Sequence, residues 1–272
     1  TALASLLRAS RIPRPEDLPP FFGGAVGFLS YDVVRRFERL PSLADDDLPV
    51  PDFLFAFVDL LAAVDHKTNL LHLIFSPPLE RLLGEPREKL YQEGCDRLAE
   101  LEARLSVPSR PLGQDLPTGP FTATPDQTRA SYMERVRHCQ DYIRAGDIYQ
   151  ANLSHRFTIE CGGLPGSSHD RIGSALYQRL RKVNPSPFSG LFEWDDLCLV
   201  SSSPERLVRL NGRTVDTRPI AGTRPRGRSL SEDRRLAEEL LTNQKERAEH
   251  LMLVDLERND LGRVCEFGSV RV

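Results

Sequence analysis

Residues 189–217 read SGLFEWDDLCLVSSSPERLVRLNGRTVDT, and this stretch decides the fold class. Its apolar and β-branched residues predict four short strands, over 189–194, 197–202, 206–210 and 214–217. Asn211-Gly212 separates the last two, and this dipeptide is a strong signal for a tight β-hairpin. Strands joined by such short turns pair antiparallel, so we expect antiparallel sheet here rather than regular βαβ units.

Helices are predicted on both sides of this sheet-forming stretch. Residues 127–145 carry apolar side chains near a 3.6-residue period, and Gly146 is a natural stop. Residues 148–159 then alternate like a strand. After the hairpin, residues 231–260 have a helical pattern with acidic side chains near its start.

The N-terminal part of the chain has the same mixed character. Residues 21–75 are rich in strand formers, and the apolar runs 53–64 and 70–75 flank a turn-like segment, which fits a β-meander. Leucines at helical spacing predict a helix over 79–105. The sequence therefore predicts an α+β chain.

The region 107–127 is rich in proline and glycine and has no periodicity, so we interpret it as a linker. It separates an N-terminal region, residues 1–106, from a second region, residues 128–272. There is no initiator methionine, and residues 268–272 resemble a turn followed by a strand that has barely begun. We therefore expect the sequence to be truncated at both ends.

Composition excludes several classes of protein. With 272 residues, 40% hydrophobic, 28% charged and a net charge of −3, the chain has no overall basic field for nucleic acid or anionic membranes. Its longest apolar runs are too short to span a bilayer. The five cysteines are an odd number without a C-x-x-C pair, which favours neither a disulfide framework nor a zinc site. We expect reduced thiols in a cytoplasmic protein.

Two carboxylates in the last predicted helix suit a hard cation. Glu246 and Glu249 are three residues apart, so on a helix they share a face, with Cβ atoms about 5–6 Å apart. Mg²⁺ typically takes one or two protein carboxylates together with substrate oxygens. The spacing alone leaves an alternative open, a solvated acidic face paired with Lys245 and Arg247.

Two further segments combine features of a binding site. Ala221 and Gly222 are small enough to let a ligand approach the backbone, whose N–H groups can hold a carboxylate. On the predicted strand 148–159, Gln150 and Asn152 share one polar face. The alternatives are a basic surface turn for the first segment and an edge strand with one wet face for the second.

Together these segments resemble the chorismate-utilising enzymes, a family that includes component I of anthranilate synthase, component I of aminodeoxychorismate synthase, and the isochorismate and salicylate synthases. The resemblance covers nearly the whole chain in family order. The matching pieces are GGAVGFLSYD at 23–32, ERLP at 38–41, AGDIYQANLSHRF at 145–157, NPSPF at 184–188, SSSPER at 201–206, TRPIAGTRPRG at 217–227 and KERAEHLMLVDLERNDLGRV at 245–264.

The resemblance implies a fold, a metal and a substrate. The fold would be two facing, largely antiparallel sheets flanked by helices, incomplete at the C-terminus. Chorismate would bind through Mg²⁺, with Glu249 the best candidate ligand and Glu246 beside it. Ala221, Gly222 and Thr223 would line the substrate pocket. The family's remaining site residues would follow residue 272, so we expect the chain to be poorly active by itself.

Position 150 separates the branches of this family. In the isochorismate and salicylate synthases a lysine matches this place and activates water, whereas Gln150 has no basic nitrogen and cannot act as a general base. A catalytic position without that base favours a nucleophile that is already reactive, namely ammonia supplied by a glutamine amidotransferase partner. Ala221 stands where some aminodeoxychorismate synthases carry a nucleophilic lysine, so ammonia would add directly.

The identity of the product is a closer choice. Anthranilate synthases commonly show Tyr-Met after N-P-S-P, and this chain has Phe188-Ser189. That difference argues against tryptophan inhibition, and the segments 149–153 and 203–206 also resemble aminodeoxychorismate synthases. The resemblance therefore favours Mg-dependent formation of 4-amino-4-deoxychorismate, on the route to para-aminobenzoate and folate. Anthranilate formation in tryptophan biosynthesis, by 2-amination and pyruvate elimination, is the alternative. Less favoured are an isochorismate or salicylate synthase and a non-catalytic binding fragment. RNA binding by the arginines of 218–228 lacks an interleaved aromatic platform.

Overall fold

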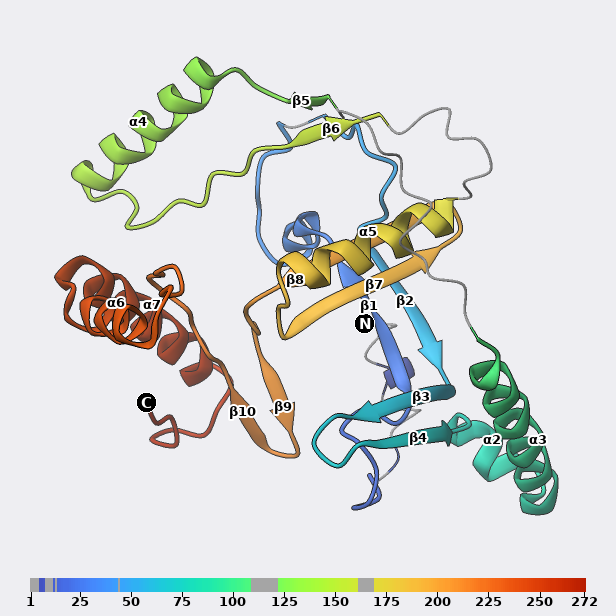
Figure 1. Ribbon diagram of the computed structural model, residues 1–272. Coiled ribbons are helices and arrows are strands. Elements are labelled where there is room, and N and C mark those ends of the chain that lie inside the picture. Colours follow the sequence, from blue (N-terminus) through green and yellow to red (C-terminus); the bar gives the residue numbers. More distant parts are fainter. Residues whose placement is uncertain (1–4, 8–11, 13, 44, 109–121, 161–168) are drawn as a thin grey trace. The chain divides into compact units, whose positions relative to one another are not determined.

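The structure is a computed structural model that describes residues 5–7, 12, 14–43, 45–108, 122–160 and 169–272, with the backbone alone for 169–171. The chain divides into two compact units, Thr1–Pro111 and Leu112–Val272. Most of the predicted linker, residues 107–127, lies outside the described residues. The mixture of helices and antiparallel strands confirms the predicted α+β class (Figure 1).

The strands of the first unit form two antiparallel pairs. β1 (Gly24–Leu29) pairs with β2 (Phe53–Val58), and β3 (Leu60–Asp65) pairs with β4 (Leu70–Phe75). The predicted meander is therefore wrong for the described residues, and the predicted run 53–64 is two strands. The interruption is Asp59, whose carboxylate accepts two hydrogen bonds from Arg97.

The turn between β3 and β4 is confirmed and has a local cause. Asp65 Oδ1 accepts a hydrogen bond from the backbone N–H of Lys67 at 2.8 Å. Asn69 adopts a φ of 59°, the left-handed conformation that asparagine tolerates better than most residues. The turn is thus determined by Asp65 and Asn69, which are close together in the sequence. The sequence alone therefore reveals it.

A proline divides the helix predicted over 79–105. The two resulting helices are α2 (Leu79–Gly84) and α3 (Arg87–Ser106), which follow β4. The 3₁₀ helix η1 (Tyr31–Arg36) lies earlier in the chain, after β1. Pro86 precedes α3, and proline disfavours the helical conformation in the residue before it, so Glu85 is extended and the helix is interrupted there. α3 contacts β4, where the buried Ile74 and Leu90 contribute to the core.

Arg81 connects the two helices and predicts a pH dependence. Its guanidinium donates to Glu85 and Glu93, and Arg81, with a smaller contribution from Lys89, lowers the pKa of Glu85 from 4.5 to about 2. A carboxyl whose pKa is lower in the folded state stabilises the fold above its unfolded pKa, and this contribution is lost as the pH falls towards about 2. We expect Arg81→Ala to flatten the free energy of unfolding against pH between about 4.5 and about 2, as measured by denaturant titration.

Arg104→Ala is the matched control for this experiment, because Arg104 lies exposed near the end of the same helix α3. Its pH profile should follow that of the unaltered protein. Parallel profiles for the Arg81 variant and the unaltered protein would show that the pairs around Arg81 contribute nothing to acid stability.

In the described part of the second unit, the first strand pair is joined through a helix. β5 (Ala123–Pro125) pairs with β6 (Phe157–Ile159), and α4 (Arg129–Ala145) lies between them in sequence. The hydroxyl of Thr128 caps α4 by accepting from the N–H of Ser131 at 3.2 Å, and Gly146 ends it with a φ of 82°. The predicted helix is confirmed, whereas the predicted strand 148–159 is wrong except for β6, because residues 147–156 form a loop.

The stretch 189–217 forms four strands, as predicted, in two antiparallel pairs, of which the second is the hairpin predicted at Asn211-Gly212. β7 (Phe188–Trp194) pairs with β8 (Leu197–Ser203), and β9 (Arg209–Asn211) pairs with β10 (Thr214–Asp216). Gly212, the first loop residue of the second hairpin, has a φ of 60°. A helix that the sequence did not predict, α5 (His169–Val183), packs against β7 and β8 (Figure 1).

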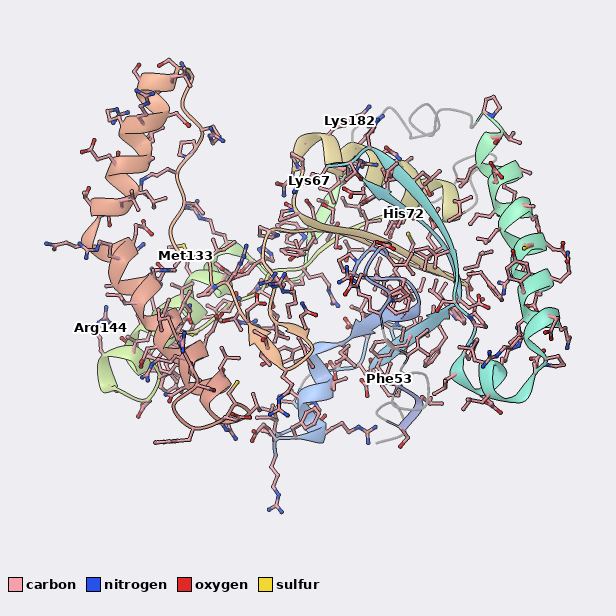
Figure 2. The ribbon with its side chains drawn as sticks, turned by 90° about the horizontal axis from the view of Figure 1, so that it is seen from below. Phe53, Lys67, His72, Met133, Arg144 and Lys182 are labelled. Atoms are coloured by element: carbon pink, nitrogen blue, oxygen red, sulfur yellow. The ribbon has the colours of Figure 1, made fainter. Side chains whose placement is uncertain are left out.

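The helical pattern over 231–260 is two helices rather than one. α6 (Leu230–Thr242) and α7 (Gln244–Gly262) contact each other and are separated by Asn243 alone. Side chains project from the elements of both units (Figure 2). Several apolar side chains are exposed to solvent. Phe53 of β2 is 57% exposed and Met133 of α4 is 41% exposed, so the packing of the described residues leaves apolar surface open to solvent.

Candidate functional site

The segment 217–224 leaves β10 and forms an irregular turn. Gly222 has a φ of 72°, which a glycine adopts without strain. The backbone N–H of Ile220 donates to Glu205 Oε1 at 2.7 Å, so a carboxylate just after β8 holds the start of the turn. Sequence reasoning missed Glu205 as part of this group, although it lies within the conspicuous segment SSSPER at 201–206.

The break between α6 and α7 determines where the acidic pair lies. The N–H of Asn243 donates to the carbonyl of Glu239 at the end of α6, and its side-chain oxygen accepts from the N–H of Glu246 at 3.1 Å. Asparagine suits this double role because its short side chain caps the orphan amides of a helix N-terminus. Glu246 therefore lies in the first turn of α7, and Glu249 lies about one turn further along.

The turn and the first turn of α7 are in direct contact. A Cβ built on Gly222 would lie 2.7 Å from Glu246 Oε2, so the backbone passes close against this carboxylate. Arg224 Nη1 donates to Glu246 Oε1 at 3.2 Å and to the carbonyl of Thr223 at 2.8 Å. The Glu246 side chain is 15% exposed. Of the residues predicted to form the site, Gly222, Thr223 and Glu246 are thus brought together.

A groove of about 380 Å³ opens beside this contact. Ala221 and Glu246 line it, together with leucines of α6 and a basic side chain of α7. The complete lining is Ala221, Leu240, Leu241, Glu246, Arg247, His250 and Leu251. The groove therefore joins an apolar wall to a charged one, an arrangement typical of sites for small polar ligands.

The two glutamates differ in their freedom to hold a divalent cation. Glu246 Oε1 is occupied by Arg224, so this carboxylate is partly neutralised. Glu249 is half-buried and makes no hydrogen bond or ion pair with any residue that the structure describes, so its oxygens are open to a hard cation. Across the described ranges, no group of three or more His, Cys, Asp or Glu residues is placed to hold a metal ion. Glu249 fits as a single Mg²⁺ ligand, and Glu246 fits less well.

Gln150 makes no polar contact with this group among the described residues. It is exposed on the loop between α4 and β6, and no hydrogen bond or ion pair joins it to residues 221–249 within the part of the chain described. The loop is anchored instead to its own surroundings, because the ring of His155 stacks on that of Tyr132 with centroids 5.6 Å apart. The role predicted for Gln150 remains a prediction.

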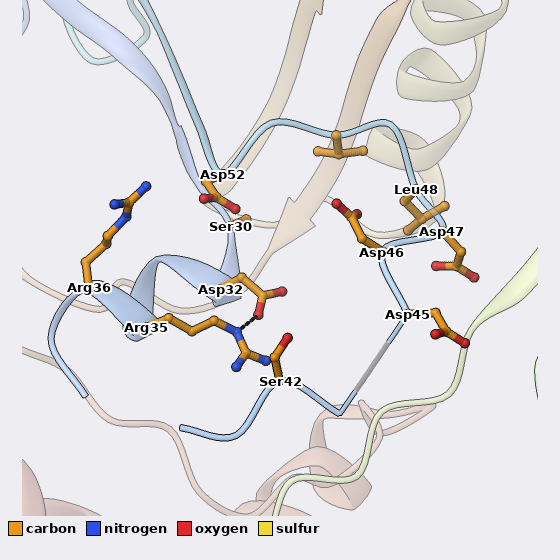
Figure 3. A pocket seen from close by; sticks show the side chains of 11 residues that line it. Ser30, Asp32, Arg35, Arg36, Ser42, Asp45, Asp46, Asp47, Leu48 and Asp52 are labelled. Atoms are coloured by element: carbon orange, nitrogen blue, oxygen red, sulfur yellow. Dashed lines mark hydrogen bonds and ion pairs between the residues drawn. The ribbon is translucent and has the colours of Figure 1, made fainter. Parts of the chain in front are cut away.

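A cavity of the first unit lies around η1 (Figure 3). It measures about 650 Å³, and Arg35 pairs with Asp32 inside it at 2.6 Å. Its walls are rich in carboxylates, namely Asp32, Asp45, Asp46, Asp47 and Asp52. No described cluster there meets the geometry of a metal site, and the motifs predicted from the sequence to carry the chemistry lie in the second unit, so the candidate site is taken at residues 217–250.

None of the described helices combines the length and apolar character that a bilayer crossing requires.

A model of the family described as chorismate binding enzyme matches residues 2–272. The anthranilate synthase component 1 of Thermus thermophilus is 49% identical over 261 residues, which is 96% of this chain and 52% of that protein. The aminodeoxychorismate synthase component 1 of Bacillus subtilis is 42% identical over 260 residues, covering 94% of this chain and 51% of the relative.

A solved structure agrees with these relatives. The crystal structure of anthranilate synthase component I from Streptococcus pneumoniae TIGR4 superposes with a TM-score of 0.78 at 31% identity, over 96% of this chain and 55% of that one. The chain thus spans about half the length of the proteins it matches. The family match, extending over nearly every residue, confirms the resemblance drawn from the motifs: this chain belongs to the chorismate-binding enzymes.

Proposed function

We propose that this chain forms the chorismate-binding part of a component I enzyme that aminates chorismate with ammonia and releases anthranilate. The observation that carries the proposal is the turn of residues 221–223, which packs on the first turn of α7 beside a groove of about 380 Å³. The turn's small residues leave backbone N–H groups accessible to a substrate carboxylate. Chorismate carries two carboxylates, so a site of this kind suits it.

Magnesium belongs to the same proposal. Glu249 would hold it, with Glu246 as a neighbour rather than an equal partner, because Arg224 already pairs with Glu246. When bound, the ion would neutralise a carboxylate of chorismate and ease departure of the 4-hydroxyl group. Gln150 would occupy the position of the lysine base of the isochorismate and salicylate synthases. Because glutamine cannot activate water, ammonia would be the nucleophile.

The relatives favour anthranilate over the aminodeoxychorismate that Phe188-Ser189 suggested. The Thermus thermophilus protein is 49% identical and is named anthranilate synthase, whereas the Bacillus subtilis aminodeoxychorismate synthase is 42% identical. Formation of 4-amino-4-deoxychorismate remains the second candidate, because that relative covers nearly as much of the chain, 94% against 96%, and because the Tyr-Met pair is absent after N-P-S-P.

The name component 1 implies a partner component in the relatives. We propose a glutamine amidotransferase that delivers ammonia to this chain's site, in a biosynthetic enzyme of the cytoplasm. In the complete protein we expect the helices and strand pairs to belong to two facing antiparallel sheets with the site between them.

Product analysis tests the proposed function. The protein in its full natural length is supplied with chorismate, an ammonium salt and Mg²⁺, and the products are separated. We expect anthranilate, which is detected directly by its fluorescence. Aminodeoxychorismate is revealed by adding a lyase that converts it to aminobenzoate, and finding it as the main product would select the second candidate. Isochorismate or salicylate as the main product would contradict amination altogether.

A further inference from the structure

We propose that Arg224 is a positioning residue that holds the turn of residues 221–223 on the first turn of α7. The inference rests on the proposed function, in which this turn binds chorismate. It deepens that function by assigning the geometry of the turn to one side chain that lies outside the predicted set of substrate and metal ligands.

The guanidinium of Arg224 contacts three parts of the site at once. Its Nε donates to Glu239 Oε1 near the end of α6 at 3.0 Å, and its Nη1 donates to Glu246 Oε1 at 3.2 Å. The same Nη1 donates to the carbonyl of Thr223 at 2.8 Å. The planar fork of arginine can satisfy several acceptors in fixed directions, which the single ammonium of lysine cannot reproduce.

The turn depends on side chains for its position. No backbone–backbone hydrogen bond joins residues 218–224 to other described parts of the chain. Its start is held by Glu205, which accepts from the N–H of Ile220, and its end is held by Arg224. With one anchor removed, the backbone at Gly222 is no longer fixed against Glu246, and the N–H groups proposed to bind the substrate lose their alignment.

Arg224 is more buried than Arg226, the next arginine along the segment. Arg224 is 19% exposed and Glu246 15%, so the pair is poorly screened by water, and removing the arginine leaves a carboxylate without its counter-charge. Arg226, two residues further on, pairs with Asp233 at 2.7 Å but is 89% exposed. Because exposed ion pairs contribute little, Arg226 provides a matched control on the same segment.

The test compares Arg224→Ala, Arg224→Lys and Arg226→Ala in the full-length protein by steady-state kinetics. Loosening a turn that binds chorismate weakens the binding of the ground state and of the transition state by similar amounts. KM for chorismate should therefore rise by about 10-fold or more in Arg224→Ala. KM for ammonium should be unchanged. Arg224→Lys should recover only part of the loss because it lacks the fork, and Arg226→Ala should match the unaltered enzyme.

A purely structural role gives a different pattern. If Arg224→Ala merely unfolds part of the population, kcat falls with the folded fraction while KM for chorismate stays the same, and that result overturns the inference. If Arg224→Ala fails to fold, Glu239→Ala is used, which removes the contact of Arg224 with α6 and a 3.7 Å ion pair with Arg235, at a side chain that is 48% exposed. It should raise KM for chorismate in the same direction, and an unchanged KM overturns the inference.

The two proposals fail in different ways. An unaltered protein that forms no amine product from chorismate and ammonium overturns the proposed function, and the role of Arg224 falls with it. An unaltered protein that is active, together with an Arg224→Ala variant indistinguishable from Arg226→Ala, overturns the positioning role and leaves the proposed function intact.

Discussion

Replacing Glu249 with glutamine should abolish most of the magnesium-dependent binding of chorismate. Glutamine keeps the size of the side chain but removes the anionic oxygen that a hard cation requires. Because loss of residues that merely support a metal ligand already costs about 10–100-fold, loss of the ligand itself should weaken magnesium-dependent binding by at least about 100-fold. Calorimetric titration of chorismate with and without Mg²⁺ measures the effect.

Two variants make this experiment specific. Asp255→Asn removes a carboxylate from the same helix that pairs with Arg258 and is 65% exposed, so it should leave binding unchanged. Glu246→Gln should weaken chorismate binding because the pair that holds the turn of residues 221–223 is lost. Chorismate binding by this variant should still increase with Mg²⁺, because the Glu246 carboxylate is already paired with Arg224 in the unaltered protein. The assignment fails if Glu249→Gln keeps its magnesium response or if Glu246→Gln alone removes it.

Replacing Gly222 with alanine should damage both stability and binding. A residue with a Cβ is strained at a φ of 72°, and the new methyl group would lie 2.7 Å from Glu246 Oε2. Left-handed strain costs about 1–2 kcal/mol and overpacking adds to it, so we expect the free energy of unfolding to fall by about 2–3 kcal/mol. Denaturant unfolding gives the stability, and chorismate titration shows whether the turn has moved.

The matched control is Gly262→Ala at the end of α7. A Cβ at Gly262 meets no atom within 4 Å, and its φ is not in the left-handed range. Alanine there should be neutral or stabilise by about 0.4–1 kcal/mol, because it restricts the unfolded chain. Equal stabilities for the two variants would mean that the turn does not require glycine at position 222.

Features determined by neighbouring residues were accessible from the sequence. Thr128 and Gly146 begin and end α4 through contacts with residues at most a few positions away, and Asn211-Gly212 gives its hairpin for the same reason. The helix break at Asn243 was missed because the periodic pattern of apolar residues continues across it. Only the capping contact from Asn243 to the N–H of Glu246 reveals where one helix stops and the next begins.

Features determined by distant residues were not accessible. Gly173 weakens the helical pattern of α5, yet a Cβ there would collide with Cys198 on β8, so packing rather than propensity explains it. The alternation around Gln150 resembled a strand, but strand formation requires a partner, and the pairing begins only at Phe157. The contacts of Arg224 span 15 and 22 residues, a separation that no local pattern encodes.

The strand pairs have a consequence for the exchange of amide hydrogens with solvent. Within the described residues every sheet consists of two strands, so each strand has a neighbour on one side only. In an antiparallel pair, alternate amides point towards the partner and the others point away from it. Protection from exchange should therefore alternate along these strands, whereas α3, α4 and α7 should give uninterrupted runs of slowly exchanging amides in their interiors.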